Sequence, residues 1–292
     1  MFEDQAASLR RKLGQGIPRR EVKEAQTVSI ISGKGGVGKS NVALNLSLEL
    51  VGQQKRVLLF DLDIGMGNID ILMGVSARKS IVNLLQNFET IEEIIEIGPL
   101  GLSYIAGGSG LNELFSIDSK SREHFFEQYE KLLSSYDYII FDMGAGVTED
   151  TMSFILASDE CIVVTTPEPT SITDAYGMIK HVLANNSKMP IKVIMNRSLS
   201  VKEGKRSLNQ FREVVMQFLK VDVTALGILP DDKHVSQAVI RQIPYSIYNK
   251  HAPISKAMQQ LANHYTKDLP HGLLQSGRKT FLQKLKQLMT ER

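Results

Sequence analysis

The sequence predicts an α/β fold, a doubly wound and mostly parallel sheet flanked by helices, and three observations lead to this prediction. Seven short apolar runs alternate with segments of helical periodicity, at residues 28–32, 56–61, 102–106, 138–142, 161–166, 191–196 and 225–229. Some runs are apolar almost without interruption, such as Cys161 to Val164, which is typical of parallel strands covered on both faces. A glycine-rich loop follows the first run and precedes a helical pattern at 41–51, so we expect a ligand at the carboxyl ends of the strands.

Length and composition predict one large domain with an extension at each end. The chain has 292 residues, of which 42% are hydrophobic, enough for a substantial core. Residues 1–26 lack a long apolar stripe and contain Gly14, Gly16 and Pro18, so we expect a flexible segment before a main domain at 27–270. Basic residues gather near both ends, but the net charge of +2 is too small to predict nucleic-acid binding, and we expect none.

The loop at residues 32–40 has the residue types that hold a nucleotide phosphate. Its glycines allow a tight turn that directs N–H groups at phosphate oxygens, Lys39 adds a charge for the β- and γ-phosphates, and Ser40 offers a hydroxyl to Mg²⁺. The following helix points its N-terminus at the phosphates, which disfavours the alternative of a glycine-rich turn without a ligand. The expected nucleotide-binding residues are Gly33, Gly35, Gly36, Val37, Gly38, Lys39, Ser40 and Asn41.

Lys34 is a second lysine in this loop, although Lys39 already supplies the charge that the phosphates need. The run from Lys34 to Ser40 resembles the K-G-G-x-G-K-[ST] pattern of the MinD/ParA group of P-loop ATPases. In that group the first lysine reaches across an ATP-sandwiched homodimer, as an arginine finger does in other nucleotide hydrolases. The resemblance implies a slow, Mg²⁺-dependent ATP hydrolase that forms a homodimer with ATP, alternates between ATP and ADP, and uses Lys34 and Lys39 in catalysis.

Acidic residues follow the second and fourth apolar runs. Asp61 and Asp63 alternate at the end of a buried run, where carboxylates are costly without a metal ion, water or hydrogen-bond donor. The resemblance implies that Asp63 orients the attacking water and that Asp61 lies near Mg²⁺, with a turn-forming role as the alternative for Asp61. Asp142 ends an apolar run before Gly144, the form of a Walker B strand whose aspartate holds Mg²⁺, usually through water. The expected metal-site residues are Ser40, Asp61 and Asp142.

Two loops are assigned to the adenine base by the resemblance alone. It implies that Asn196 hydrogen-bonds the adenine edge and that Pro230 and Asp231, or Asp232, line the base pocket. Without the resemblance, both loops are ordinary turns at the ends of strands.

The cysteine content excludes the iron–sulfur carriers and nitrogenase-type iron proteins that share this type of loop, because both need paired ligand cysteines. A single cysteine, Cys161, permits neither a disulfide framework nor a cysteine-ligated cluster within one subunit, and we expect it to be buried and inert. The sequence contains no signal peptide and no apolar run near the ~18 residues that span a bilayer, so we expect a cytoplasmic protein.

The C-terminal segment, residues 271–292, has the pattern of a basic amphipathic helix. The apolar residues Phe281, Leu282, Leu285, Leu288 and Met289 fall on one helical stripe, flanked by Lys284 and Lys286. Such a helix is expected to bind an anionic membrane surface, which places the protein at the inner face of the cell membrane as a peripheral component. The alternative is a terminal helix packed on the domain, and both hold if the helix is docked in the monomer and released in the ATP dimer.

The N-terminal segment narrows the resemblance. The residues from Asp4 to Arg10, D-Q-A-x-x-L-R, resemble a segment of the FlhG group of MinD-like ATPases, which govern flagellar number and position. In that group the segment stimulates FlhF, a GTPase, so Gln5 and Arg10 are expected to bind an FlhF-type partner, and flagellar switch-complex proteins are implied as further partners. A plain disordered tail is the alternative.

Other functions stay open on the sequence alone. A cell-division regulator of the MinD type shares the membrane helix, and a DNA-partition ATPase of the ParA type shares the catalytic core but binds DNA through surface Lys and Arg. An interaction scaffold with vestigial hydrolysis is disfavoured because Lys34, Lys39, Asp63 and Asp142 are all present.

Overall fold

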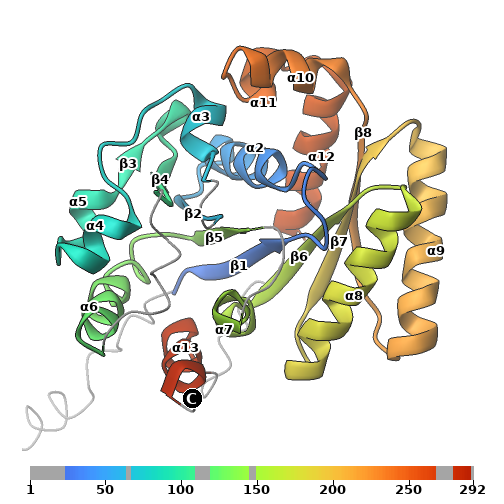
Figure 1. The fold of residues 1–292 in the computed structure, drawn as a ribbon. Helices are drawn as coiled ribbons and strands as arrows, with labels where there is room; N and C mark the ends of the chain where they lie inside the picture. The colour runs from blue at the N-terminus through green and yellow to red at the C-terminus, as the bar shows by residue number, and fades with distance from the viewer. Residues whose placement is uncertain (1–23, 64–66, 109–118, 145–148, 268–278, 291–292) are drawn as a thin grey trace, which may run out of the picture.

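The computed structural model describes residues 24–63, 67–108, 119–144, 149–267 and 279–290, and these residues form the predicted sheet flanked by helices (Figure 1). The strands lie in the order β3-β4-β2-β5-β1-β6-β7-β8, and all pairs are parallel except β3 with β4. The strands are β1 (Gln26–Ile31), β2 (Val57–Leu62), β3 (Glu96–Ile97), β4 (Ser103–Ile105), β5 (Tyr138–Met143), β6 (Glu160–Thr165), β7 (Ile191–Ser198) and β8 (Thr224–Pro230).

All seven predicted strands are confirmed, with ends that differ by no more than two residues. Within the described ranges, the strand that the sequence did not predict is β3, which has two residues and pairs antiparallel at the sheet edge. Near-continuous apolar runs predicted the others well because β2, β5 and β6 are buried at every residue.

Helices cover both faces of the sheet and create two hydrophobic layers. The layer on one face contains apolar side chains from α2, α3 and α12, and the layer on the other contains side chains from α4, α6, α7, α8, α9 and α13. The helices are α2 (Lys39–Gly52), α3 (Ile69–Met73), α4 (Ile81–Gln86), α5 (Ile91–Ile94), η1 (Pro99–Gly101), α6 (Ser119–Glu130), α7 (Glu149–Ala157), α8 (Pro169–Asn185), α9 (Val201–Leu219), α10 (Lys233–Ile240), α11 (Tyr245–Tyr248), α12 (Pro253–Lys267) and α13 (Phe281–Thr290).

The parallel register brings the chemically active loops to one edge of the sheet. Asp61 of β2 pairs directly with Asp142 of β5, and Asp142 also pairs with Ile30 of β1, one residue before that strand ends. The glycine-rich loop after β1 therefore lies beside both carboxylates, as expected for a ligand site at the carboxyl ends of the strands. In the part of the chain that the structure describes, no helix combines the length and apolar character needed to cross a membrane.

Candidate nucleotide site

The glycine-rich loop packs between two other elements, and this packing explains two of its glycines. Gly38, the N-cap of α2, has a φ of 89°, and a Cβ there would lie 2.6 Å from Nδ2 of Asn196. A Cβ on Gly33 would lie 2.2 Å from the backbone carbonyl carbon of Asp174 in α8. Glycine alone combines the left-handed conformation with such close approach, so the loop is held against both β7 and α8.

Lys39 brings the predicted catalytic and metal-site residues together. It is the first residue of α2 and is buried, and its Nζ lies 2.5 Å from Oδ1 of Asp142 and 4.0 Å from Oδ2 of Asp63. The same ammonium donates to Oγ of Ser40 at 3.4 Å. Four residues that the sequence assigned to phosphate, metal and water therefore meet at one point, where the ammonium is near two carboxylates.

Asp142 is suited to receive a cation. Its side chain is fully buried, its Oδ2 has no hydrogen-bond partner among the described residues, and burial raises the pKa of this carboxyl while Lys39 opposes the rise. No group of three or more His, Cys, Asp or Glu side chains in the described ranges is arranged to hold a metal ion. Mg²⁺ fits such a site because it takes one or two protein ligands and obtains the others from nucleotide phosphates and water. Ser40 and Asp142 would hold this ion, which would neutralise phosphate charge.

Asp61 has a different environment from Asp142. Its Oδ1 accepts a hydrogen bond from the backbone N–H of Asp63 at 3.0 Å, and its Oδ2 accepts from those of Asn68 at 2.9 Å and Ile69 at 3.2 Å. Burial, together with the charge of Asp142, raises the pKa of Asp61 to about 7. Because both oxygens already bind the loop after β2, the geometry favours the turn-forming alternative over a direct metal contact.

Lys34 contacts a different part of the site from Lys39. Its Nζ lies 3.3 Å from Oε2 of Glu168 and 3.2 Å from Oγ1 of Thr170, at the start of α8. Both charged side chains are exposed, so the ion pair is weak and its lysine can leave at little cost. Glu168 and Thr170 could not be predicted from the sequence, since they lie more than 130 residues from Lys34 and no local pattern marks them.

The loops assigned to adenine lie next to the glycine-rich loop. Asn196 is buried, and its Nδ2 donates to the carbonyl of Val37 at 2.8 Å, so this amide supports the phosphate loop directly. Pro230 ends β8, and the N–H of Asp231 donates to the carbonyl of Ser198 at 2.9 Å, which joins the two loops. The residues assigned to the base are therefore brought together at the edge that carries the glycine-rich loop.

Two residues beside these loops have structural roles. Arg197, adjacent to Asn196, has a left-handed φ of 54° and forms an ion pair of 3.9 Å with Asp231. Asp232 caps α10 by accepting from the N–H of His234 at 3.0 Å, and it also accepts from the N–H of Ile254 at 3.2 Å. Asp232 therefore fixes the starts of α10 and α12, whereas the sequence offered it only as an alternative to Asp231.

The predicted membrane stripe lies on the protein core. Phe281, Leu282 and Leu285 of α13 are buried, while Leu288 and Met289 are partly buried against the same hydrophobic layer. The ring of Phe281 stacks on that of Phe141, the neighbour of Asp142, with centroids 5.1 Å apart. The alternative of a packed terminal helix describes this state, and the stripe can reach lipid only after α13 leaves its site.

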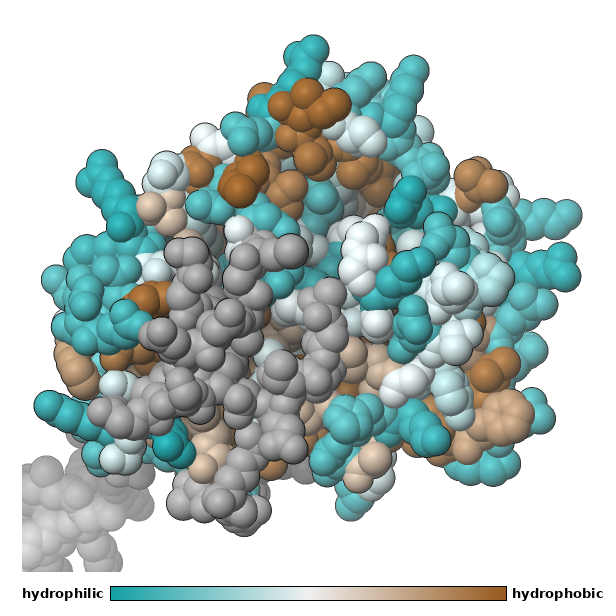
Figure 2. Space-filling view, viewed as in Figure 1, coloured by the Kyte–Doolittle hydropathy of each residue, from teal (hydrophilic) through white to brown (hydrophobic). Residues whose placement is uncertain are grey.

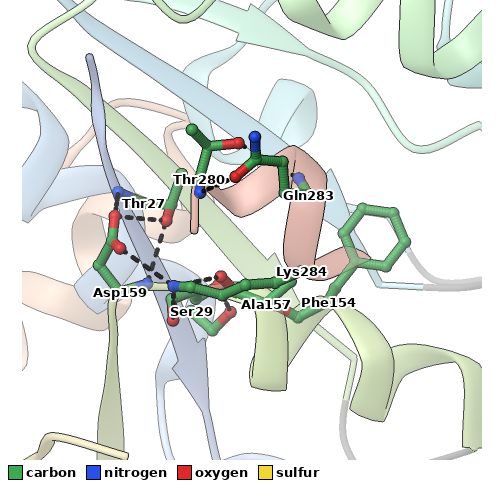
Figure 3. Close-up of polar contacts among 9 residues, drawn as sticks. Thr27, Ser29, Phe154, Ala157, Asp159, Thr280, Gln283 and Lys284 are labelled. Atoms are coloured by element: carbon green, nitrogen blue, oxygen red, sulfur yellow. Dashed lines mark hydrogen bonds and ion pairs between the residues drawn. The ribbon is translucent and has the colours of Figure 1, made fainter. Parts of the chain in front are cut away.

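Polar contacts hold α13 as well (Figure 3). Nζ of Lys284 donates to the carbonyls of Ala157 at 3.0 Å and Ser158 at 3.4 Å, at the end of α7, and lies 3.2 Å from Oδ1 of Asp159. Oδ2 of Asp159 accepts from both the N–H and the hydroxyl of Thr27 in β1. Lys284 is thus fixed on the domain and does not extend toward solvent as the membrane prediction requires. Gln5 and Arg10 lie outside the described residues.

Sequence and structure comparisons agree with the geometry of the site. The family model ParA, described as NUBPL iron-transfer P-loop NTPase, matches residues 23–266. The chain belongs to this P-loop NTPase family. The family resemblance inferred from Lys34 to Ser40 is therefore confirmed.

Relatives with flagellar names cover most of the chain. The flagellum site-determining protein YlxH of Helicobacter pylori is 35% identical over 266 residues, 88% of each protein. The antiactivator FleN of Pseudomonas aeruginosa is 30% identical over 217 residues, 74% of this chain and 78% of FleN. The solved septum site-determining protein MinD of Pyrococcus horikoshii, complexed with Mg-ADP, has a TM-score of 0.68 at 25% identity and covers 83% of this chain and 96% of that one.

The iron-transfer part of the family description does not fit these residues. Cluster transfer needs thiolate ligands, and the one cysteine, Cys161, is buried in β6, where burial raises the pKa of its thiol. The prediction of a buried Cys161 is confirmed.

Proposed function

We propose that this chain is an ATP-dependent, dimerising switch ATPase that regulates flagellar number and placement. The observation that carries the proposal is its similarity to YlxH and FleN over most of its length, combined with a second lysine in the phosphate loop. A lysine that contacts Glu168 and Thr170 is free to serve a neighbouring subunit, because Lys39 already occupies the phosphate end of its own site.

The proposed reaction is Mg²⁺-dependent hydrolysis of ATP at the interface of two subunits. The loop amides and Lys39 bind the phosphates, Ser40 and Asp142 hold Mg²⁺, and Asp63 orients the attacking water. Lys34 of each subunit neutralises transition-state charge in the other site. Asn196, Pro230 and Asp231 bind the base, and hydrolysis to ADP returns the dimer to monomers.

In the proposed function, the C-terminal helix binds the membrane and the N-terminal segment binds partner proteins. ATP-dependent dimerisation releases α13, so that Phe281, Leu282, Leu285, Leu288 and Met289 can insert into the anionic inner face of the cell membrane. Two such helices in one dimer bind with avidity, which places membrane affinity under nucleotide control. Gln5 and Arg10 stimulate an FlhF-type GTPase, and flagellar switch-complex proteins are further partners.

The decisive experiment compares Lys34→Ala with Lys39→Ala in binding, dimerisation and hydrolysis. Lys39→Ala should abolish ATP binding, whereas Lys34→Ala should bind ATP with little change and lose hydrolysis by at least ~100-fold, with no dimer in light scattering with ATP. Glu168→Gln is the control, because it removes the partner of Lys34 within the subunit and keeps the lysine. Full hydrolysis in Lys34→Ala, or after Asp63→Ala, would overturn the assigned roles.

A MinD-type role in cell division is the second candidate, favoured by the structural similarity to MinD. The two functions differ in the N-terminal segment, since only the flagellar function requires Gln5 to act on a GTPase. Stimulation of GTP hydrolysis by an FlhF-type GTPase, lost in Gln5→Ala, supports the flagellar function. Equal GTPase rates with and without the chain would favour the division function.

A further inference from the structure

An exposed apolar patch lies on α3 and α10, on the face of the sheet opposite α13. We call Ile71, Val239, Ile240 and Ile243 the α3–α10 patch. Their side chains are 54%, 39%, 81% and 38% exposed, which makes Ile240 the most exposed large hydrophobic residue of the described chain. Figure 2 shows apolar surface gathered at the top of the view, over α10 and α11. A cluster of exposed aliphatic side chains is costly in water and marks a candidate interaction site.

The patch lies between two loops of the nucleotide site. A Cβ on Gly74, which ends α3, would lie 2.6 Å from the carbonyl oxygen of Gln242, which follows α10, so these ends are in direct contact. α3 begins after Asn68, whose N–H is held by Asp61, and α10 begins at the Asp232 cap beside the proposed base pocket. A molecule bound to the patch would therefore touch the elements that follow both loops.

The charge along α10 and the segments that follow it is one-sided. Residues 233–267 contain five Lys or Arg and three His but no Asp or Glu. Lys233 and Arg241 at the two ends of α10 are exposed, and neither forms an ion pair with a described carboxylate, although Arg241 lies over the ring of Tyr248. Three carboxylates lie beside the patch. Asp70 in α3 accepts from the N–H of Ile71, Asp232 is engaged in capping α10, and Asp231 pairs with Arg197. The α10 side of the patch therefore complements an acidic partner.

We propose that the α3–α10 patch binds an amphipathic helix of a partner protein, with an aliphatic face on Ile71 and Ile240 and carboxylates facing Lys233 and Arg241. Lys233 and Ile240 are seven residues apart and lie on one face of α10, as a helix docked along it requires. A second copy of this chain docked through α10 is disfavoured, because an antiparallel α10–α10 contact would place Lys233 of one copy beside Arg241 of the other. The consequence for ATP turnover rests on the proposed function; the binding itself does not.

A labelled peptide tests the proposal directly. The probe is a synthetic helix of about 18 residues with Leu and Ile at i, i+3, i+4 and i+7 and Glu elsewhere, and its control is a permuted peptide of equal composition without the stripe. Fluorescence anisotropy with the full chain should show binding of the striped peptide alone, weakening when salt is raised. Ile240→Ser and Arg241→Glu should each weaken binding by about tenfold. Phe218→Ser is the matched control, since Phe218 of α9 is 64% exposed and lies outside the patch.

Each outcome decides the proposal without reference to ATP hydrolysis. No binding of the striped peptide, equal binding of the permuted one, or an equal loss in Phe218→Ser would overturn it. Loss of anionic-vesicle binding in Ile240→Ser without peptide binding would assign the patch to lipid and also overturn it. Peptide binding that depends on Ile240 and Arg241 supports the surface even where the flagellar function fails, and a change of ATPase rate on peptide binding separately tests its link to the site.

Discussion

Single side chains shape the nucleotide site mainly by bonding to the backbone of distant loops. Asp61 holds the loop after β2, Asn196 holds the glycine-rich loop, and Asp232 holds the starts of two helices. A buried backbone group that loses its partner costs about 1–3 kcal/mol, so these residues affect both stability and ligand affinity.

Asn196→Asp tests the support of the phosphate loop. The change keeps the shape of the side chain but replaces the donor to the Val37 carbonyl with an acceptor, so two oxygens face each other in a buried position. We expect a loss of about 1–3 kcal/mol in the free energy of unfolding and weaker ATP binding. Urea unfolding and nucleotide titration measure these effects. Asn185→Asp, which removes an exposed donor to the His181 carbonyl, should have little effect, and an equal loss in both variants would contradict this role.

The lowered pKa of Asp232 should make the free energy of unfolding depend on pH in the acid range. Burial raises the pKa of Asp232, but hydrogen bonds from His234 and from the N–H of Ile254 outweigh this effect and leave the pKa below its usual value. The stabilisation is therefore present above the unfolded pKa of 3.8 and is lost as pH falls through the folded value.

Asp232→Ala should lower the free energy of unfolding by about 1 kcal/mol at neutral pH, because α10 loses its cap, and should reduce the further loss of stability below pH ~4. Asp232→Asn keeps a capping oxygen but has no titrating carboxyl. It should therefore be more stable than Asp232→Ala at neutral pH, and its free energy of unfolding should change as little with pH below ~4 as that of Asp232→Ala. Urea unfolding across this pH range checks the prediction, and an acid loss equal to that of the parent in both variants would refute it.

At the scale of elements, α13 docks on the domain through the same apolar face that the proposed membrane binding would use. Phe281, Leu282 and Leu285 are buried on the domain, so their substitution would weaken docking and lipid binding together. A change at Lys284 can separate docking from lipid binding, because its ammonium binds the end of α7 and Asp159 in the docked state and lies outside the apolar stripe. The cation at the C-terminus of α7 is also favourable for the helix dipole.

Lys284→Met should release α13 without damaging its apolar face. Losing hydrogen bonds worth about 1–3 kcal/mol shifts docking by roughly tenfold, so vesicle binding in the absence of nucleotide should increase. Lys279→Met is the control, since Lys279, two residues before α13, donates to Gln287 of that helix, and its loss removes the same positive charge. Sedimentation with anionic vesicles measures both, and equal binding of the two variants would contradict a docking role for Lys284.

How much of an element the sequence predicts depends on how strongly burial marks its residue types. Continuous apolar runs identified β1, β2 and β4 to β8, because burial on both faces leaves a direct signal in residue type. The two residues of β3 are too few to create a period, so its antiparallel pairing is visible only in the structure. An apolar stripe such as that of α13 shows that a face will be covered, but lipid and protein select the same residue types.

For the candidate site, the sequence predicted the residues next to the strand ends but not the contacts between distant segments. The loop residues and the carboxylates are adjacent in sequence to strands, so Lys39, Asp63 and Asp142 could be placed at one edge in advance. Contacts over long separations could not: Lys34 with Glu168, and Asn196 with Val37, depend on how α8 and β7 pack on the loop. Asp61 was ambiguous because a buried carboxylate can bind a metal or backbone amides, and only coordinates distinguish these.

For the whole molecule, the nucleotide site and α13 are joined through β5. Phe141 stacks on Phe281 of α13, and its neighbour Asp142 pairs with Lys39 in the site. Because Phe141 and Asp142 are adjacent in β5, a change at Asp142 can alter the packing of α13. If ATP raises the affinity for a membrane by this route, linkage requires that the membrane raise the affinity for ATP by the same factor.

This reciprocity can be measured with a non-hydrolysable ATP analogue and anionic vesicles. We expect vesicle affinity to rise by about tenfold or more with the analogue over ADP, and the preference for the analogue over ADP to rise equally when vesicles are added. Truncation after Gly272 is a poor control, because it would uncover the apolar layer under Phe281 and Leu285. Leu288→Glu with Met289→Glu is better, since these residues are only partly buried; it should keep nucleotide binding and lose both effects. Vesicle binding that is equal with the analogue and with ADP would refute coupling between the site and the helix.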